Sequence, residues 1–143
     1  MLFERKIERI VIHCTGSSPF APVENILREF KIKGWKNPGY HFLVLRTGEV
    51  RQILPLEDIA NGAQGYNATA IHVAYIGGWE NNSYRDTRTP EQREAIFKTI
   101  QALKQQCPSA EVLGHCELNK NKGCPLFNVK KEYAQWVDSC CCK

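Results

Sequence analysis

The sequence lacks any long apolar run. No stretch approaches the roughly 18 to 20 apolar residues that a membrane-spanning helix needs. Charged residues interrupt the opening segment, MLFERKIERI, before the apolar core of a secretory signal could form. We therefore expect a protein with no membrane span that is cytoplasmic when synthesised. If it acts outside the cell, another agent must release it.

Repeats, low-complexity tracts, Pro/Ser-rich linkers and blocks of Lys and Arg are also missing. We expect residues 1–143 to form one domain, because 43% hydrophobic and 24% charged residues make the chain too apolar to be disordered. The formal net charge of +4 favours an anionic partner such as a cell-wall polymer, or serves only to keep the protein soluble. Because the basic residues are scattered, no nucleic acid partner is expected.

Cysteine, in contrast, is abundant, with seven residues. In a secreted protein this number would suggest disulfides, but no secretory signal accompanies them. Cys140, Cys141 and Cys142 form a run beside the last residue, where a frayed terminus makes a poor chelator. We interpret residues 138–143 as a disordered tail and place the informative cysteine at Cys124.

Apolar patterns predict strands that alternate with helices. The predicted strands cover residues 7–13, 40–45, 50–54, 70–76 and 111–113, with a turn at Thr47 and Gly48. A first helix is predicted from one apolar face formed by Val23, Ile26, Leu27 and Phe30, with Gly34 placed to end it. Residues 55–60 are predicted to hold one short helical turn.

Two later helices have clear start signals. Thr89, Pro90 and Gln92 form a capping box with proline in the first turn, and Ile96, Ile100 and Leu103 form the inner face. Asn128 caps a last helix, whose core-facing residues are Val129, Tyr133, Trp136 and Val137. This mixture predicts an α/β fold: a single domain with a central mixed β-sheet flanked by helices. Loops at the strand ends are then the natural place for a site.

Three candidate metal ligands lie at or after predicted strands. His13 ends the first strand, His115 follows the last one, and Cys124 lies nine residues further on. Two imidazoles and a thiolate suit one Zn²⁺ per chain and leave a fourth position for water. Cys14 and Cys116 directly follow the histidines, and strand alternation should turn both into the core. Spacing alone is weak evidence, because a lone histidine is more often an ordinary surface or core residue.

Six short segments occur in an order that is specific when taken together. They are IVIHCTGS, GYHFLVLRTGEV, GYNATAIHVAYIGG, TPEQ, LGHCE and KGCP, all within residues 10–136. In this order they resemble the type-2 N-acetylmuramoyl-L-alanine amidase family, especially the short phage lysozyme-amidases. Peptidoglycan recognition proteins are more distant members of the same group.

The resemblance implies a site residue by residue. The family's zinc ligands fall on His13, His115 and Cys124, its catalytic tyrosine on Tyr40 and its catalytic lysine on Lys122. It also implies hydrolysis of the amide bond between the muramic acid lactyl group and L-alanine of peptidoglycan, by an endolysin of phage or prophage type. The alternatives are a cytosolic amidase that recycles soluble muropeptides and a non-catalytic muropeptide-binding module. A monomer is expected.

The sequence departs from this pattern at one place. A histidine often precedes the GYN motif in similar proteins, and here that position is Gly62. Substrate contacts of this loop are therefore open. Asn67 of GYN either contacts a muropeptide or stabilises a turn.

The chemistry of amide hydrolysis agrees with the implied residues. Zinc can activate water near neutral pH and polarise a carbonyl group. Because no HExxH motif supplies a glutamate base, other groups must manage protons and charge. Lys122 can place an ammonium near the developing oxyanion, and Tyr40 can donate a hydrogen bond to the oxyanion or bind the attacking water.

Four further aromatic residues have no assigned chemistry. We predict that His41 supports the site or the fold, and that His72 lies in the core or on the opposite face rather than binding metal. Trp35 and Trp79 line a sugar groove or belong to the core.

Overall fold

A computed structural model describes residues 4–133. A five-stranded sheet has the order β3-β2-β4-β1-β7, and its strands are β1 (Arg9–Cys14), β2 (Phe42–Val44), β3 (Val50–Gln52), β4 (Ala70–Tyr75) and β7 (Glu111–Gly114). The helices are α1 (Val23–Ile32), α2 (Pro90–Gln106) and the short α3 (Val129–Glu132). Two 3-10 helices, η1 (Asn67–Thr69) and η2 (His115–Glu117), and a small hairpin of β5 (Trp79–Glu80) and β6 (Ser83–Tyr84) complete the fold.

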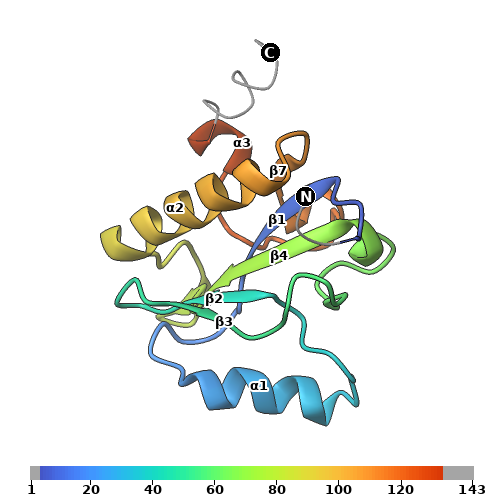
Figure 1. The fold of residues 1–143 in the computed structure, drawn as a ribbon. Coiled ribbons are helices and arrows are strands. Elements are labelled where there is room, and N and C mark those ends of the chain that lie inside the picture. The colour runs from blue at the N-terminus through green and yellow to red at the C-terminus, as the bar shows by residue number, and fades with distance from the viewer. Residues whose placement is uncertain (1–3, 134–143) are drawn as a thin grey trace.

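The sheet is mixed, as the sequence predicts. Strand β1 pairs in parallel with β4 and β7, and β2 pairs in parallel with β4. Strand β3 is antiparallel to β2. Helix α1 covers one face of the sheet and α2 covers the other, so the α/β prediction is confirmed (Figure 1). The carboxyl ends of β1, β4 and β7 therefore meet at one edge.

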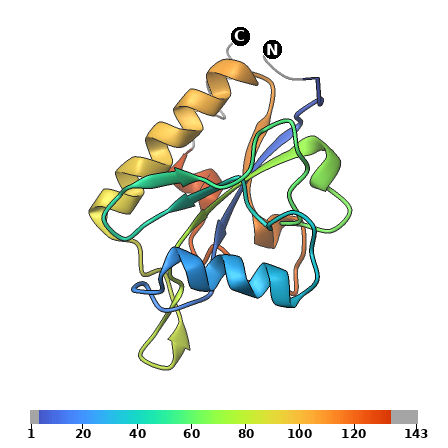
Figure 2. The same ribbon diagram turned by 60° about the horizontal axis from the view of Figure 1, so that its bottom comes forward.

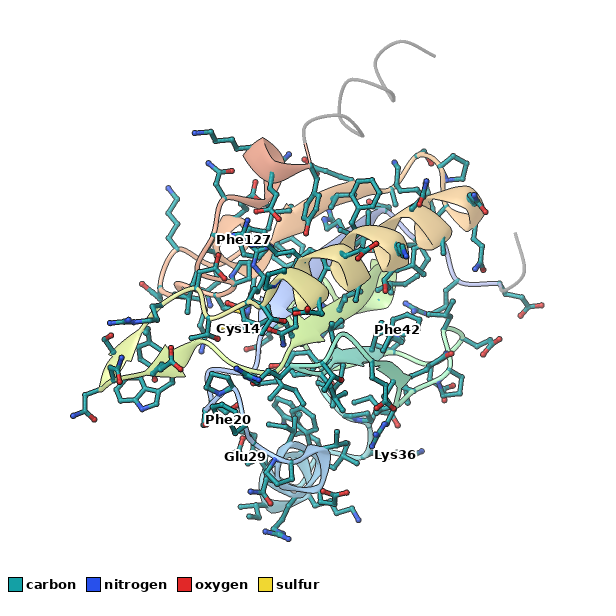
Figure 3. All side chains as sticks on the ribbon, turned by 90° about the vertical axis from the view of Figure 1, so that its left-hand side faces the viewer. Cys14, Phe20, Glu29, Lys36, Phe42 and Phe127 are labelled. Carbon is teal, nitrogen blue, oxygen red and sulfur yellow. The ribbon has the colours of Figure 1, made fainter. Side chains whose placement is uncertain are left out.

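Each face of the sheet has its own apolar core. The larger core packs α2 and α3 against inward residues of the strands, including Ile12 and Tyr75. The smaller core packs Phe30 and its neighbours on α1 against Leu43 and Ala74. Cys14 and Phe127 belong to the α2 side, whereas Glu29 is part of α1 and Phe20 lies beside that helix (Figure 3). The alternate β1 residues Ile10, Ile12 and Cys14 all belong to the core on the α2 side.

The predicted helix signals are confirmed where the structure describes them. Thr89 accepts from the backbone N–H of Gln92, whose side chain accepts from the Thr89 N–H in return. The backbone of Gly34 adopts φ +78° directly after α1. Asn128 accepts from the N–H of Lys131 at the start of α3. The later part of that predicted helix, with Trp136 and Val137, and the tail with Cys140, Cys141 and Cys142 lie outside the described residues.

The helical turn predicted at residues 55–60 is a single turn rather than a helix, and three short elements were not predicted. Residues 55–60 contain no helix, only a turn closed by the hydrogen bond from Asp58 N–H to Pro55 C=O. The side chain of Arg5 donates to the carbonyls of Leu56 and Ala70, which holds this segment against the sheet in an irregular course. Helices η1 and η2 and the β5–β6 hairpin are too short to produce a periodic pattern. Figure 2 shows this hairpin projecting from the body of the fold.

None of the helices within residues 4–133 is long and apolar enough to cross a membrane.

A buried ion-pair cluster attaches α3 to the rest of the fold. The Arg88 side chain is 0% exposed, donates to Asp86 and Glu132, and lies 3.3 Å from the ring centroid of Phe127. Removing one member of such a buried cluster leaves charge without a partner, which typically costs about 3 to 5 kcal/mol. We expect Arg88→Ala to lower the free energy of unfolding by about 3 kcal/mol in urea titrations. A control is Arg51→Ala, whose ion pair with Glu49 is exposed and should contribute less than about 1 kcal/mol.

Candidate active site

The structure brings the three predicted metal ligands together. One donor atom from each of His13, His115 and Cys124 lies within 4.8 Å of the other two. The ring centroids of the two histidines are 4.7 Å apart. His13 is buried, and the other two are half-buried. A single ion can therefore contact two nitrogens and one sulfur, a donor set that suits zinc.

Sheet topology explains how residues so distant in sequence meet. His13 is near the carboxyl end of β1, and His115 begins η2 directly after the neighbouring parallel strand β7. Cys124 comes from the loop that follows, whose position is fixed by three hydrogen bonds. The Cys116 N–H donates to the Cys124 carbonyl, Tyr75 Oη donates to the Pro125 carbonyl at 2.7 Å, and the Cys14 N–H donates to Cys124 Sγ at 2.9 Å.

Strand alternation predicts only one of the two neighbouring cysteines correctly. Cys14 is buried on the α2 side, opposite His13, as predicted. Cys116 is half-buried rather than in the core, because His115 and Cys116 lie in a 3-10 helix where alternation does not apply. Neither thiol belongs to the metal-ligand cluster.

A pocket of about 580 Å³ opens at the three ligands, and both predicted catalytic residues line it. The Tyr40 hydroxyl donates to the Cys14 carbonyl at 3.4 Å, and the Tyr40 ring centroid is 5.1 Å from that of His13. Lys122 lies on the exposed loop that also carries Cys124. Asn67 is not among the lining residues. A second pocket of about 570 Å³, between β3 and α2, contains none of the predicted site residues.

Burial keeps the site histidines neutral and the tyrosine protonated. Burial lowers the pKa of His13 well below its ordinary value, with smaller contributions from His72 and His115. Burial and then the positive charge of Lys122 lower the pKa of His115. Burial raises the pKa of Tyr40, so its hydroxyl remains a hydrogen-bond donor at neutral pH. Neutral imidazole is the form that binds metal.

The neighbouring Cys14 thiol and burial together raise the pKa of Cys124. The thiolate form of Cys124 therefore needs a compensating positive charge. A bound cation would supply that charge, because a thiol that coordinates a metal ion is deprotonated.

Comparison with known proteins identifies the family. The sequence pattern of the N-acetylmuramoyl-L-alanine amidase family matches residues 3–126. The chain belongs to this family. It is therefore an enzyme, with amidase activity of the phage endolysin type.

Three relatives illustrate the range of similarity. The endolysin of Escherichia phage T7 is 29% identical over 127 residues, which cover 87% of this chain and 83% of the phage protein. A peptidoglycan-recognition protein of Drosophila melanogaster is 26% identical over 137 residues, covering 91% and 74% of the two chains. The solved structure of the Ph2119 endolysin, from a bacteriophage of Thermus scotoductus MAT2119, matches with a TM-score of 0.77 and 25% identity, covering 93% of this chain and 86% of that one.

The structure of the amidase gives Asn67 and His41 internal partners. Asn67 Oδ1 accepts from the N–H of Ala63 at 2.8 Å, which stabilises the turn before η1. His41 Nε2 donates to the carbonyl of Asp58 at 2.8 Å, and its Nδ1 accepts from the His72 N–H at 3.0 Å. His41 thus supports the fold, as predicted. A substrate contact by Asn67 stays a prediction.

The core interpretation is wrong for both tryptophans. Trp35 and Trp79 are each 37% exposed. Trp35 stacks on Phe30 and lines the pocket of the amidase. Trp79 packs edge to face on Tyr84, with ring centroids 4.7 Å apart, and Tyr84 lines the pocket. A sugar-binding role of the two tryptophans stays a prediction.

Sequence reasoning missed several polar residues of the pocket. Asn61, Gln64, Asn119 and Asn121 line it and offer amide groups that can bind a peptide. They lie in the loops before the GYN and KGCP motifs, so proximity to these motifs was the only available indication. His72 was also missed as a neighbour of the metal site, because a lone histidine inside a strand resembles a core residue.

The buried histidine His41 makes the stability of the amidase depend on pH. Burial lowers the pKa of His41 to about 4 from its ordinary 6.5. Below about pH 6.5 the unfolded chain therefore binds a proton that the folded chain rejects, so stability is complete above this pH and is lost as pH falls towards 4. We expect His41 to account for a loss on the order of 2 kcal/mol between pH 7 and pH 5 in the metal-free protein. Urea titrations of wild type and His41→Gln at both pH values measure this difference. Equal pH dependence in the two proteins would contradict the assignment.

Proposed function

We propose that the amidase is a zinc hydrolase that cuts the amide bond between the lactyl group of muramic acid and L-alanine of the stem peptide. The observation that supports this most strongly is the meeting of His13, His115 and Cys124 in a pocket that Tyr40 and Lys122 also line. The donor set fits one Zn²⁺ per chain, because three protein ligands leave a position for a reactant. When bound, zinc would supply Lewis acidity, which activates water and polarises a carbonyl group.

Tyr40 and Lys122 then act on the charge that develops during hydrolysis. The Tyr40 ring lies beside that of His13. The protonated hydroxyl of Tyr40 makes only a long hydrogen bond, of 3.4 Å, to the Cys14 carbonyl, and it can instead donate to the carbonyl oxygen of the scissile amide as that oxygen becomes negative. Lys122 lines the same pocket as the ligands, and its positive charge is the second cause of the lowered pKa of His115. It can stabilise the same oxygen and later donate a proton to the leaving amine.

We propose peptidoglycan in the intact wall as the substrate. The pocket presents amide side chains for the stem peptide and aromatic rings for the glycan, among them Asn61, Asn121 and Trp35. The protein would act as an endolysin of phage or prophage type, made in the cytoplasm and released through a membrane opening formed by a partner. The other substrate assignment is soluble muropeptide in the cytoplasm.

The products of digestion test the bond and the substrate. Purified protein is incubated with purified cell walls, and the soluble products are separated and identified by mass spectrometry. We expect free stem peptides with a new amino-terminal alanine, while the glycan strands keep their lactyl groups and length. Cleavage between sugars or inside the peptide would refute the assignment. Rates on intact walls and on soluble muropeptides, measured side by side, distinguish the endolysin from the recycling enzyme.

A further inference from the structure

His72 is a buried histidine that contacts a metal ligand without belonging to the ligand cluster. It is 0% exposed within β4. Its Nδ1 lies 2.8 Å from Nε2 of His13, and the two ring centroids are 4.9 Å apart. Val11 of β1 is paired with His72 of β4, so these two side chains point to the same face of the sheet. His13 is two residues after Val11 on the same strand and therefore points to that face as well. His72 was expected in the core or on the opposite face rather than as a ligand. It is buried and outside the ligand cluster, but its side chain faces the site, so the opposite-face alternative is wrong.

The hydrogen bonds around His72 determine where each proton lies. The Ala63 N–H lies 2.8 Å from the Asn67 amide and can only donate a hydrogen bond. The atom of the Asn67 amide that faces it must therefore be the oxygen, Oδ1. The same oxygen lies 2.9 Å from His72 Nε2, which must therefore carry the proton. Since one nitrogen of neutral imidazole is a donor and the other an acceptor, His72 Nδ1 is an acceptor.

The same logic continues to the metal ligand. Because His72 Nδ1 accepts, His13 Nε2 must donate to it. The remaining nitrogen of His13, Nδ1, then carries the lone pair that a metal needs. Hydrogen bonds of this kind fix the tautomer and ring orientation of metal-binding histidines in general, and removing the partner typically weakens metal binding about 10-fold to 100-fold.

Gly62 leaves the space that the His72 ring occupies. A Cβ at position 62 would lie 2.5 Å from His72 Nδ1 and 2.7 Å from the carbonyl oxygen of Gly39. Glycine there and histidine at position 72 are thus compatible in this chain, whereas any side chain at position 62 would displace the imidazole.

We propose that His72 is a positioning residue for the metal site, and that the chain Asn67–His72–His13 holds His13 with Nδ1 directed at the metal. The proposal rests on the proposed zinc site. It assigns Asn67 a role outside the pocket, as the residue that holds the far nitrogen of His72. Gly62 is part of the arrangement because it accommodates the His72 ring.

Zinc affinity of two His72 variants tests the proposal. His72→Leu keeps a similar volume but has no acceptor, and His72→Asn keeps an acceptor oxygen near the place of Nδ1. The zinc dissociation constant is measured by competition with a chromogenic chelator at pH 7.5, and the visible spectrum of bound Co²⁺ reports the ligand geometry. We expect His72→Leu to bind zinc about 10-fold to 100-fold more weakly, with a changed Co²⁺ spectrum. His72→Asn should recover most of the affinity.

His41→Gln is the matched control, because His41 is equally buried and stacks on His72 but does not contact His13. Its zinc affinity should match that of wild type. Wild-type affinity in His72→Leu, or an equal loss in His41→Gln, would overturn the proposal. A wild-type protein that binds no zinc would instead refute the proposed function itself.

A spectroscopic measurement on the wild-type protein tests the proposal without depending on whether a variant folds. Nitrogen-15 NMR of the metal-free protein distinguishes the two neutral tautomers of each histidine. We expect His13 and His72 both to carry the proton on Nε2. A proton on Nδ1 of His13 would overturn the proposal.

Discussion

Cys124→Ala is expected to lose both its zinc and its activity. Cys124 is one of the three donors that residues 4–133 contribute to the cluster, and its sulfur already accepts a hydrogen bond from the backbone of Cys14. Two histidines alone hold zinc far more weakly than two histidines and a thiolate, because the negative ligand is lost. Zinc content by elemental analysis should fall from about one per chain to near zero, and wall hydrolysis should fall to background.

Cys116→Ala serves as the control for this variant. Cys116 lies between His115 and Cys124 in the chain, and only its backbone N–H bonds to the Cys124 loop. Its thiol is outside the ligand cluster, so zinc content and activity should remain near those of wild type. One tightly held zinc in Cys124→Ala would show that the sulfur is not a ligand.

Lys122→Ala should lower kcat far more than it weakens substrate binding. If the ammonium stabilises negative charge that exists only in the transition state, its removal affects the chemical step. Loss of one such donor typically costs on the order of a hundredfold to a thousandfold in kcat. Zinc content should stay near one per chain, since a protonated lysine does not bind metal. Steady-state kinetics and elemental analysis on the same preparation measure both effects.

The competing explanation is that Lys122 only attracts an anionic wall. Lys122→Ala would then raise KM, added salt would mask the difference, and kcat would be nearly unchanged. Lys120→Ala is the matched control, because Lys120 is on the same loop but does not line the pocket. It should reproduce any general charge effect without the loss of kcat. An unchanged kcat in Lys122→Ala would exclude the catalytic role.

Local signals predicted most of the secondary structure. The capping box at Thr89 and the apolar face that begins at Val23 depend on neighbours within a few residues, so the sequence alone contains them. Local signals predicted a helical turn at residues 55–60. The observed path of this segment differs because it depends on Arg5, about fifty residues earlier in the chain. Such a long-range contact leaves no periodic pattern.

The metal site needed more than spacing. His13 and His115 are far apart in sequence, and they meet because β1 and β7 are parallel neighbours. Pairing order cannot be read from apolar patterns, so the family resemblance was needed to select these residues. The role of His72 could not be predicted in either way, because it depends on hydrogen bonds between side chains of adjacent strands.

Removal and return of the metal tests the central claim most directly. The protein is treated with a strong chelator, the chelator is removed, and zinc is added back in substoichiometric steps. Zinc content and wall hydrolysis are measured at each step. We predict that activity disappears with the metal and returns in proportion to added zinc, reaching its full value at one ion per chain. Full hydrolysis by protein shown to be free of metal would contradict the account.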